Sequence, residues 1–309
     1  MTATTRAEPA PGIAVIDKPA GWTSHQVVGR VRRLLGTRKV GHAGTLDPMA
    51  TGVLVLGVGR ATRLLGQLAL TAKSYDATIR LGQATVTDDA EGEVTQAHGA
   101  TELTDAAVES AMAVLRGNIQ QVPSSVSAIK LNGVRSYARV RSGDEVTLLA
   151  RPVRVTRFDV LGRRDVSIGM LPVVDLDVTV DCSSGTYVRA LARDLGAALG
   201  TGGHLTALRR TRVGPFTLSE AQPLDRQGPA VTERAVSELA VIELSDVARR
   251  CFRTVTLTPE QARDVGYGRK LADLNLPDGL TAMLAPSGAF LALYRPEGSA
   301  AVPEAVFVG

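Results

Sequence analysis

The stretch KVGHAGTLDPMATGVLVLGVG, from Lys39 to Gly59, joins a glycine-containing loop to a strongly apolar run. The apolar half, GVLVLGVG, predicts a buried strand. In the loop, Pro48 biases Asp47 towards an extended or turn conformation, and Gly41 and Gly44 permit close backbone approach or a positive φ. These residues leave two explanations for the lone carboxylate. It either hydrogen-bonds its own turn or is held there for chemistry.

Helices and strands alternate irregularly on both sides of this stretch. A helix is predicted after Thr23, with apolar residues spaced for one face and Gly36 at its end. Further helices are predicted after Thr104 and in SSGTYVRALARDLGAALG, residues 183–200. SYDATIRLGQ, RPVRVTRFDVLG and PVVDLDVTVDC alternate as strands do. Without regular βαβ units, the pattern indicates an α+β fold with a mixed, largely antiparallel sheet.

The chain divides into three predicted parts. Residues 1–11 read as a disordered leader, and residues 12–248 as the main domain. Beyond a change of composition near 222–232, Thr258 and Gln261 have the spacing of a helix capping box. Short apolar runs separated by LPDG, APSG and RPEG turns follow. Residues 249–309 therefore form a predicted small β-rich domain.

Composition excludes several classes of protein. Of the 309 residues, 44% are hydrophobic, which is enough for a packed core. The two cysteines indicate no disulfide framework, and neither they nor the four histidines have the spacing of a metal site. The N-terminus lacks the apolar core of a signal peptide, and no run approaches a membrane span. We therefore expect a cytoplasmic protein without a metal or membrane segment.

The net charge is mildly positive, at +4 with a sequence pI near 9.3. Three arginine-rich places stand out: residues 30–33, residues 209–212, and residues 135–157 with six arginines in 23 positions. Such clusters are compatible with an anionic partner such as nucleic acid. They are equally compatible with solvated surface, so the charge alone leaves both open.

Other places could contribute chemistry alongside Asp47. Tyr75 is one of only five tyrosines, and Arg189 lies near the start of a predicted helix. A core aromatic and an exposed helix arginine are the plain structural explanations for these two. A buried aspartate–arginine pair would be informative, because it is costly to assemble. The segment Asp17–Gln26, DKPAGWTSHQ, reads in isolation as a turn between a strand and a helix.

Six motifs occur in an order that resembles the TruB family of pseudouridine synthases, over roughly residues 11–220. The last 60 or so residues are similar to a PUA RNA-binding domain. The motifs are DKPAGWTS, GHAGTLDPMATGVLVLGVGRATR, KSYDATIRLGQATVTDDAEG, VPSSVSAIKLNGVRSY, SSGTYVRALARDLG and GGHLTALRRTRVGPF.

The resemblance implies a role for each matching residue. Asp47 would be the catalytic aspartate, Tyr75 would stack on the target base and take part in proton removal, and Arg189 would pair with Asp47. His42 would lie where the flipped base leaves its stack, and Leu208 would wall the pocket. The lysines expected on the substrate side are Lys18, which also supports the site within the first motif, Lys73 and Lys130.

The implied reaction isomerises a uridine at position 55 in the T-loop of transfer RNA, without a cofactor. It breaks the C1′–N1 bond, turns the uracil, and rejoins it through C5. The partner would be tRNA, through its T-loop and acceptor region, and the protein would act as a monomer. An insertion at about residues 123–156 would close over RNA. Val126 stands where the family often has an aromatic residue.

Two further readings remain open at this stage. A protein with the same surface could bind or help fold tRNA without chemistry, and the two activities could coexist. An acid-dependent hydrolase is disfavoured, because no second carboxylate or metal-ligand cluster accompanies Asp47 in the sequence. The residues do not distinguish a sugar-linked intermediate from a glycal.

Overall fold

The structure is a computed structural model that describes residues 9–124, 130–131, 134–135, 148–224 and 239–308. The first strand begins at Gly12, and the predicted leader falls largely on residues 1–8, outside the described residues. Much of the predicted insertion, including Val126, also lies outside them.

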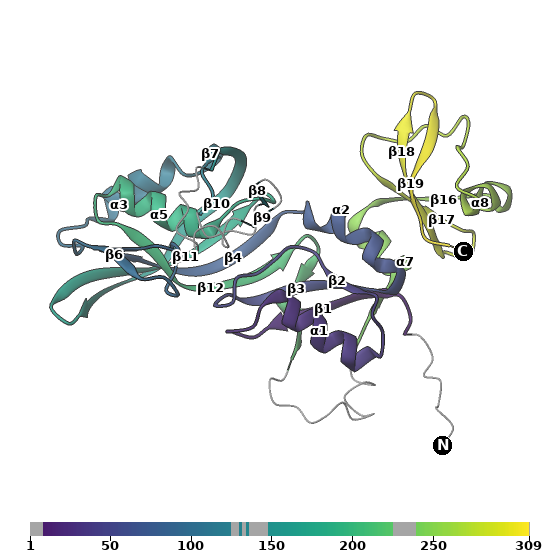
Figure 1. The fold of residues 1–309 in the computed structure, drawn as a ribbon. Helices are drawn as coiled ribbons and strands as arrows, with labels where there is room; N and C mark the ends of the chain where they lie inside the picture. The colour runs from purple at the N-terminus through teal and green to yellow at the C-terminus, as the bar shows by residue number, and fades with distance from the viewer. Residues whose placement is uncertain (1–8, 125–129, 132–133, 136–147, 225–238, 309) are drawn as a thin grey trace, which may run out of the picture.

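The main body is one long twisted sheet of mixed direction (Figure 1). Its strands run in the order β14-β1-β3-β12-β4-β11-β10-β7, with β15 beside β1, β2 beside β3 and β13 beside β12. Among the described strands of this sheet, the β1–β14 and β3–β12 pairs alone are parallel, which confirms the predicted mixed, largely antiparallel sheet. The strands are β1 (Gly12–Lys18), β2 (Val40–His42), β3 (Thr51–Val58), β4 (Lys73–Leu81), β7 (Gly117–Gln121), β10 (Arg151–Ile168), β11 (Leu171–Cys182), β12 (Gly203–Val213), β13 (Phe216–Thr217), β14 (Gln222–Pro223) and β15 (Ile242–Glu243).

Helices cover the sheet. Two of them begin after Thr23 and Thr104 as predicted, whereas the helix predicted over residues 183–200 begins only at Val188, with Tyr187 as its N-cap. Thr23 caps α1 by accepting from the backbone N–H of Gln26, whose side chain reaches back to Thr23, and Gly36 ends the helix at φ 65°. The apolar face of α1 packs on β1 and β3, whereas that of α5 packs on β4, β11 and β12. The helical segments of the main body are α1 (Ser24–Leu35), η1 (Gly59–Leu64), α2 (Leu65–Ala69), α3 (Asp105–Ala113), α5 (Val188–Ala198), η2 (Leu218–Glu220) and α7 (Leu244–Cys251).

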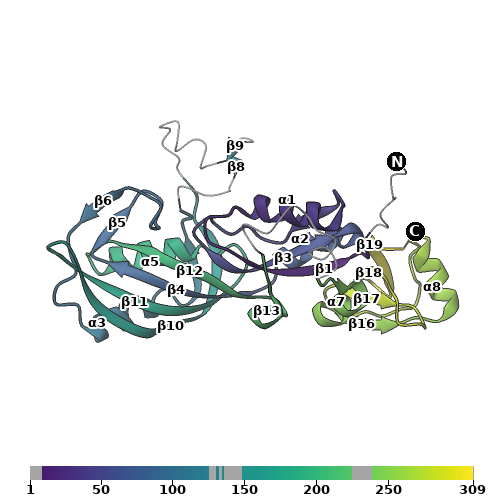
Figure 2. The same ribbon diagram turned by 90° about the horizontal axis from the view of Figure 1, so that it is seen from below.

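A second, four-stranded sheet follows in the order β16-β17-β18-β19 (Figure 2). Its helix α8 begins with the predicted capping box, in which Thr258 and Gln261 bond each other's backbone N–H. The elements of this sheet are β16 (Arg253–Thr256), α8 (Pro259–Gly266), β17 (Thr281–Leu284), β18 (Phe290–Glu297) and β19 (Ala300–Val306). Two small hairpins, β5 (Gln83–Thr85) with β6 (Val94–Ala97) and β8 (Lys130–Leu131) with β9 (Val134–Arg135), complete the described elements.

The two sheets share one hydrophobic cluster. Ile13 of the main sheet, Val247 of α7 and Phe290 of the small sheet belong to it. Arg60 and Arg63 also donate to the carbonyls of residues 307 and 306, at 2.7 and 2.6 Å. Helix α7 runs across the predicted boundary at residue 248, and removing residues 249–309 would expose this apolar cluster to water. Point substitutions are therefore cleaner tests of the small sheet than truncation.

Candidate functional site

Asp47 lies in the loop between β2 and β3, directly before the long buried strand. The backbone N–H of Ala50 donates to its carbonyl at 3.1 Å, which closes a tight turn. Among the described residues, the carboxylate makes its hydrogen bond to Arg189 rather than to its own turn. Its side chain keeps 35% of its surface accessible. The turn therefore positions the acid but leaves it open to a substrate.

Side chains of the β1–α1 turn clamp the loop on both sides of Asp47. The Ser24 hydroxyl accepts from the N–H of Leu46 at 2.9 Å and donates to the Leu46 carbonyl at 3.2 Å. On the other side, the Pro48 carbonyl accepts from Gly21 N–H at 2.8 Å and from Lys18 Nζ at 3.1 Å. The segment Asp17–Gln26, which in isolation reads as a turn between a strand and a helix, thus supports the loop that presents Asp47.

Lys18 is fully buried, and its ammonium group donates to three backbone carbonyls. The acceptors are those of Pro19, Trp22 and Pro48, at 3.1, 2.5 and 3.1 Å. Desolvation lowers the pKa of this amine to about 8, while the negative charge of Asp47 opposes the shift. Lys18 does not line the pocket described below, so its geometry is that of a support rather than a substrate contact.

Replacing Lys18 with methionine tests this distinction. The substitution leaves three carbonyls without their donor, and we expect the free energy of unfolding to fall by about 3 kcal/mol, since each buried unsatisfied group costs roughly 1–3 kcal/mol. Denaturant unfolding measures that loss. RNA affinity at a temperature where the variant is folded should stay within about twofold. A large loss of affinity without a loss of stability would make Lys18 a substrate contact.

Arg189 meets Asp47 from the first turn of helix α5. Its Nε lies 3.0 Å from Oδ2 of Asp47 and its Nη2 lies 3.3 Å from Oδ1, so the guanidinium makes a bidentate, fork-like contact with the carboxylate. Its Nη1 donates to the Thr87 carbonyl at 2.8 Å. The Arg189 side chain is only 5% exposed. The structure thus brings together two residues that lie 142 positions apart in the sequence.

A second carboxylate, which the sequence analysis did not identify, shares the same guanidinium. Oδ2 of Asp89 lies 3.6 Å from Nε of Arg189, and its side chain is 4% exposed. Its Oδ1 accepts from the Thr87 hydroxyl at 2.5 Å and from Glu91 N–H at 3.1 Å. Asp89 belongs to the TVTDDAEG segment, which reads as an ordinary polar turn. Its contact with Arg189 distinguishes it, and the residues on either side of Asp89 do not predict that contact.

The electrostatics of Asp47 reflect these neighbours. Desolvation raises the pKa of its carboxyl above the usual value, the Arg189 guanidinium opposes the rise, and the charge of Asp89 adds to it. A carboxylate must be ionised to act as a nucleophile or as a base. Arg189 therefore favours the charged form of Asp47 against the desolvation that disfavours it.

A pocket of about 260 Å³ opens in front of this pair. That volume lies just below the range of drug-sized ligand sites and is enough for a single small group. Tyr75 and Leu208 line it, as the resemblance to the family implied, together with Tyr187 and Arg210, which were not among the expected site residues. The full lining is Gly44, Thr45, Leu46, Asp47, Ala69, Lys73, Tyr75, Gly185, Thr186, Tyr187, Val188, Arg189, Leu208 and Arg210.

Tyr75 points from β4 into the pocket region and is 7% exposed. Burial raises the pKa of its phenol, and the neighbouring Arg210 guanidinium opposes the rise. A phenol with a raised pKa is neutral near pH 7. It can stack on a base and can relay a proton, by taking one while passing its own on, whereas a free phenolate would be rare.

Arg210 is a structural arginine, although the sequence placed it in a basic cluster. It is 1% exposed. Its Nε donates to the Val53 carbonyl at 2.7 Å, and its Nη1 and Nη2 donate to the carbonyls of Thr45 and Gly44, at 3.4 and 3.1 Å. It therefore braces the loop before Asp47 from the strand side, with its guanidinium bonded to three backbone carbonyls.

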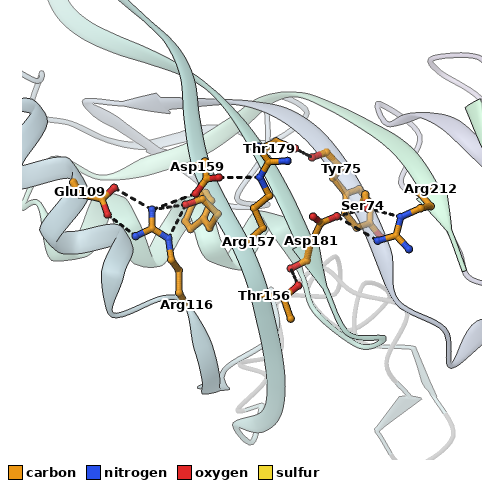
Figure 3. A network of polar contacts seen from close by, with 11 residues as sticks. Ser74, Tyr75, Glu109, Arg116, Thr156, Arg157, Asp159, Thr179, Asp181 and Arg212 are labelled. Atoms are coloured by element: carbon orange, nitrogen blue, oxygen red, sulfur yellow. Dashed lines mark hydrogen bonds and ion pairs between the residues drawn. The ribbon is translucent and has the colours of Figure 1, made fainter.

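The other arginines of that cluster are ion-paired. Arg209 contacts Asp17 at 2.6 Å. Arg212 contacts Asp181 at 3.4 Å and donates to the Ser74 hydroxyl at 3.0 Å, as Figure 3 shows. Ser74 itself donates to Asp181, so this network ties β12, β4 and β11 together beside Tyr75. The arginines at 209, 210 and 212 thus bond to other groups of the protein itself, which stabilises the fold.

The remaining predicted site residues fall in different places. Lys73 lines the pocket, and its ammonium donates to the carbonyls of Ala69 and Thr71, both at 2.8 Å. Desolvation lowers its pKa to about 8. His42 lies on β2 outside the pocket lining, with its ring edge-on to that of His25, 5.5 Å between centroids. The side chain of Lys130 lies outside the described residues.

Within the described ranges, no group of three histidine, cysteine, aspartate or glutamate side chains could hold a metal ion. None of the described helices is long and apolar enough to cross a membrane.

Comparisons with known proteins agree with this geometry. The model of the TruB family pseudouridylate synthase N-terminal domain matches residues 32–188, and two TruB C-terminal models match residues 189–227 and 252–308. The chain is 56% identical to a tRNA pseudouridine synthase B of Arthrobacter over 96% of both chains. It is 56% identical to one of Nocardia farcinica, over 99% of this chain and 95% of the relative.

Solved structures share the fold. A Cbf5–Nop10–Gar1 complex contains a chain that matches with a TM-score of 0.69 at 24% identity, covering 99% of this chain and 91% of that one. An H/ACA RNP bound to a substrate RNA containing 2′-deoxyuridine gives a TM-score of 0.68 at 24% identity, covering 96% and 85%. From the family models and the relatives, we conclude that the chain belongs to the TruB family of pseudouridylate synthases.

Proposed function

We propose that this enzyme isomerises uridine 55 in the T-loop of tRNA to pseudouridine. The observation that carries the proposal is the Asp47 carboxylate, forked by Arg189 at the wall of a base-sized pocket that Tyr75 also lines. The curated relatives named tRNA pseudouridine synthase B support tRNA as the substrate. The six sequence motifs that resemble the TruB family support the T-loop as the target.

The pocket explains why the uridine must leave its stack. A uridine stacked inside a folded loop cannot bring its ribose C1′ and its uracil C5 to Asp47, so it must be extruded at a cost of roughly a few kcal/mol. Tyr75 offers an aromatic face, and Leu208 offers an apolar wall. These contacts offset the extrusion cost, as stacking on aromatic side chains does in RNA recognition generally.

The chemistry then needs one ionised acid and one proton relay. Asp47 attacks C1′ or removes the 2′ proton, and the C1′–N1 bond breaks with its electron pair going to the uracil. The uracil turns, and C5 forms the new bond to C1′ as the Asp47–C1′ bond breaks or, in the alternative, as the 2′ proton returns from Asp47 to C2′. The proton at C5 then leaves through Tyr75, and N1 gains a proton. Uridine and pseudouridine are isomers, so the step needs no oxidant or reductant.

Other parts of the chain would bind the RNA around the site. Residues 12–248 form the catalytic domain, in which the insertion at about 123–156 contacts the RNA. Residues 249–309 form a PUA-like domain on the acceptor region of tRNA. The enzyme acts as a monomer in the cytoplasm, and His42 lies beside the base that leaves its stack. Help in tRNA folding would use the same surface without the chemistry of Asp47.

Asp89 also bears on the hydrolase reading. In the sequence, no second carboxylate accompanies Asp47, which disfavours a hydrolase. The structure contains one, but Asp89 is buried and shares the guanidinium of Arg189. Glycosidase carboxylates flank the substrate from both sides, with about 5–10 Å between them. Asp89 does not line the pocket that Asp47 lines, so the two acids do not flank a common substrate, and the geometry favours the isomerase.

Site mapping in a T-loop transcript tests the proposal. An unmodified tRNA transcript is incubated with the pure enzyme and no added cofactor, and pseudouridine is mapped by carbodiimide labelling and primer extension. We expect one modified position, residue 55. A transcript with cytidine at that position is the control and should stay unmodified. Modification confined to another arm, or none at all, would overturn the proposal.

A further inference from the structure

Gln121 grips the start of helix α5 with both ends of its side-chain amide. Its Oε1 accepts from the backbone N–H of Tyr187 at 2.8 Å, and its Nε2 donates to the Tyr187 carbonyl at 3.1 Å. Gln121 is the last residue of β7 and is 2% exposed. A single orientation of the amide satisfies both bonds, so the side chain is fully committed to one residue.

Tyr187 is the residue at which this grip matters most. It is the N-cap of α5 and provides no side-chain cap of its own. Its carbonyl also accepts from Leu191 N–H at 3.2 Å, the first bond of the helix. Capture of the Tyr187 N–H and carbonyl therefore sets both the position and the direction of the first helical turn. One turn further along α5, Arg193 Nη2 donates to the Val122 carbonyl at 2.7 Å and adds a second tie to the end of β7.

We propose that Gln121 is a positioning residue for pseudouridine formation, acting through Arg189. Arg189 lies two residues after Tyr187, on the turn that Gln121 holds, and its fork on Asp47 has contacts of 3.0 and 3.3 Å. The inference rests on the proposed function and adds a residue outside the pocket to the machinery. Ser24 does the equivalent for the Asp47 side, through Leu46.

The physical reason is that the two-contact ion pair between Arg189 and Asp47 tolerates little displacement. A guanidinium–carboxylate pair keeps both bonds only within a narrow range of position and tilt. Misplacement of a catalytic group by about 1 Å can cost roughly 100-fold in rate. Loss of the Gln121 grip lets the first turn of α5 shift, so it should lower the rate of the chemical step while leaving the RNA-binding surface in place.

The test uses three variants of the full-length enzyme and a tRNA transcript. Gln121→Met keeps the size of the side chain and removes both hydrogen bonds. Gln121→Glu keeps the acceptor but loses the donor while its carboxylate is ionised. Gln222→Met is the matched control, because Gln222 makes the same two-sided grip on Ala240, with bonds of 2.7 and 2.8 Å, away from the pocket.

We expect Gln121→Met to reduce the single-turnover rate at saturating tRNA by about 10–100-fold. Its Kd for tRNA should stay within about twofold. Gln222→Met should leave both within about twofold. The bonds of Gln222 are exposed and those of Gln121 are partly buried, so Gln121→Met should be the less stable variant, and the rates are compared at a temperature where both are folded. The comparison separates positioning from a general loss of stability.

The glutamate variant adds a readout that a purely structural role would not produce. Burial against the Tyr187 carbonyl should raise the pKa of the new carboxyl, and protonation restores the missing donor. The rate of Gln121→Glu relative to wild type should therefore rise as pH falls from 8 to 6. Arg151 faces Gln121 across the β7–β10 pairing, and Arg193 lies on α5. Both stay charged throughout. Asp88, beside Arg193, is present in both proteins and cancels in the ratio.

Two results would overturn the inference. One is a Gln121→Met rate within twofold of wild type. The other is an equal loss of rate in Gln121→Met and Gln222→Met, together with a rate of Gln121→Glu relative to wild type that does not change with pH. An inactive wild-type enzyme on the T-loop transcript would instead contradict the proposed function. The two failures are therefore distinguishable.

Discussion

Replacing Asp47 with asparagine is expected to abolish pseudouridine formation while tRNA binding stays within about twofold. The amide has nearly the same shape as the carboxylate and can still accept a hydrogen bond from Arg189, so the turn at Ala50 and the clamps on Leu46 and Pro48 should persist. An amide is neither a nucleophile at C1′ nor a base for the 2′ proton. We expect the single-turnover rate to fall by at least about 10⁴-fold, the range lost when a nucleophile is removed.

The measurement combines single-turnover kinetics at saturating tRNA with a binding assay on the same transcript. Asp17→Asn is a matched control, because it removes one carboxylate from another aspartate–arginine pair, with Arg209, that does not line the pocket. That control should retain most of its activity. A normal rate in Asp47→Asn would remove Asp47 from the chemistry.

Replacing Arg189 with alanine is expected to cost about 10²–10³-fold in the chemical rate at pH 7, comparable to the loss of one preorganised charge-stabilising donor. Desolvation raises the pKa of Asp47, and Arg189 opposes this. Without the guanidinium the pKa of Asp47 rises further, so less of the carboxylate is ionised at neutral pH. The limb of the pH–rate profile on which activity is lost towards acid should move to higher pH.

This second prediction therefore has two readouts. The rate of Arg189→Ala should recover in part as pH rises from 7 to 9, whereas the wild-type rate, limited by an acid that already ionises lower, should change less. Arg212→Ala is the control, since Arg212 pairs with Asp181 outside the pocket lining. Unchanged kinetics in Arg189→Ala would exclude Arg189 from the site. A uniform loss with an unshifted profile would contradict its role in ionising Asp47.

Much of the fold could be predicted because its signals are local. The caps at Thr23 and Thr258, the end of α1 at Gly36 and the apolar face of α1 all depend on residues within a few positions of one another. The alternation along β10 and β11 likewise indicated strands of an antiparallel sheet. The order of strands in the sheet could not be read this way, since β3 pairs in parallel with β12, about 150 residues later.

The candidate site was predictable only in part. Asp47, Tyr75, Arg189 and Leu208 were named from motifs, and the structure places all four around one pocket. Lys18 was named as well, but its ammonium is enclosed by three carbonyls. Sequence spacing cannot show whether a lysine in a turn faces a substrate or its own backbone.

By itself, the sequence determined the family, the class of fold and the acid that the loop holds, because ordered motifs and local capping and turn chemistry specify these. Only the tertiary structure decided which charges act on that acid. Asp89 reads as a turn residue, Arg210 as part of a surface cluster and Gln121 as the end of a strand until the chain folds. Their roles come from contacts with residues far away in the chain, at Arg189, Gly44 and Tyr187. Burial, which makes an unpaired charge or amide costly, is set by the packed fold and not by the neighbours in sequence.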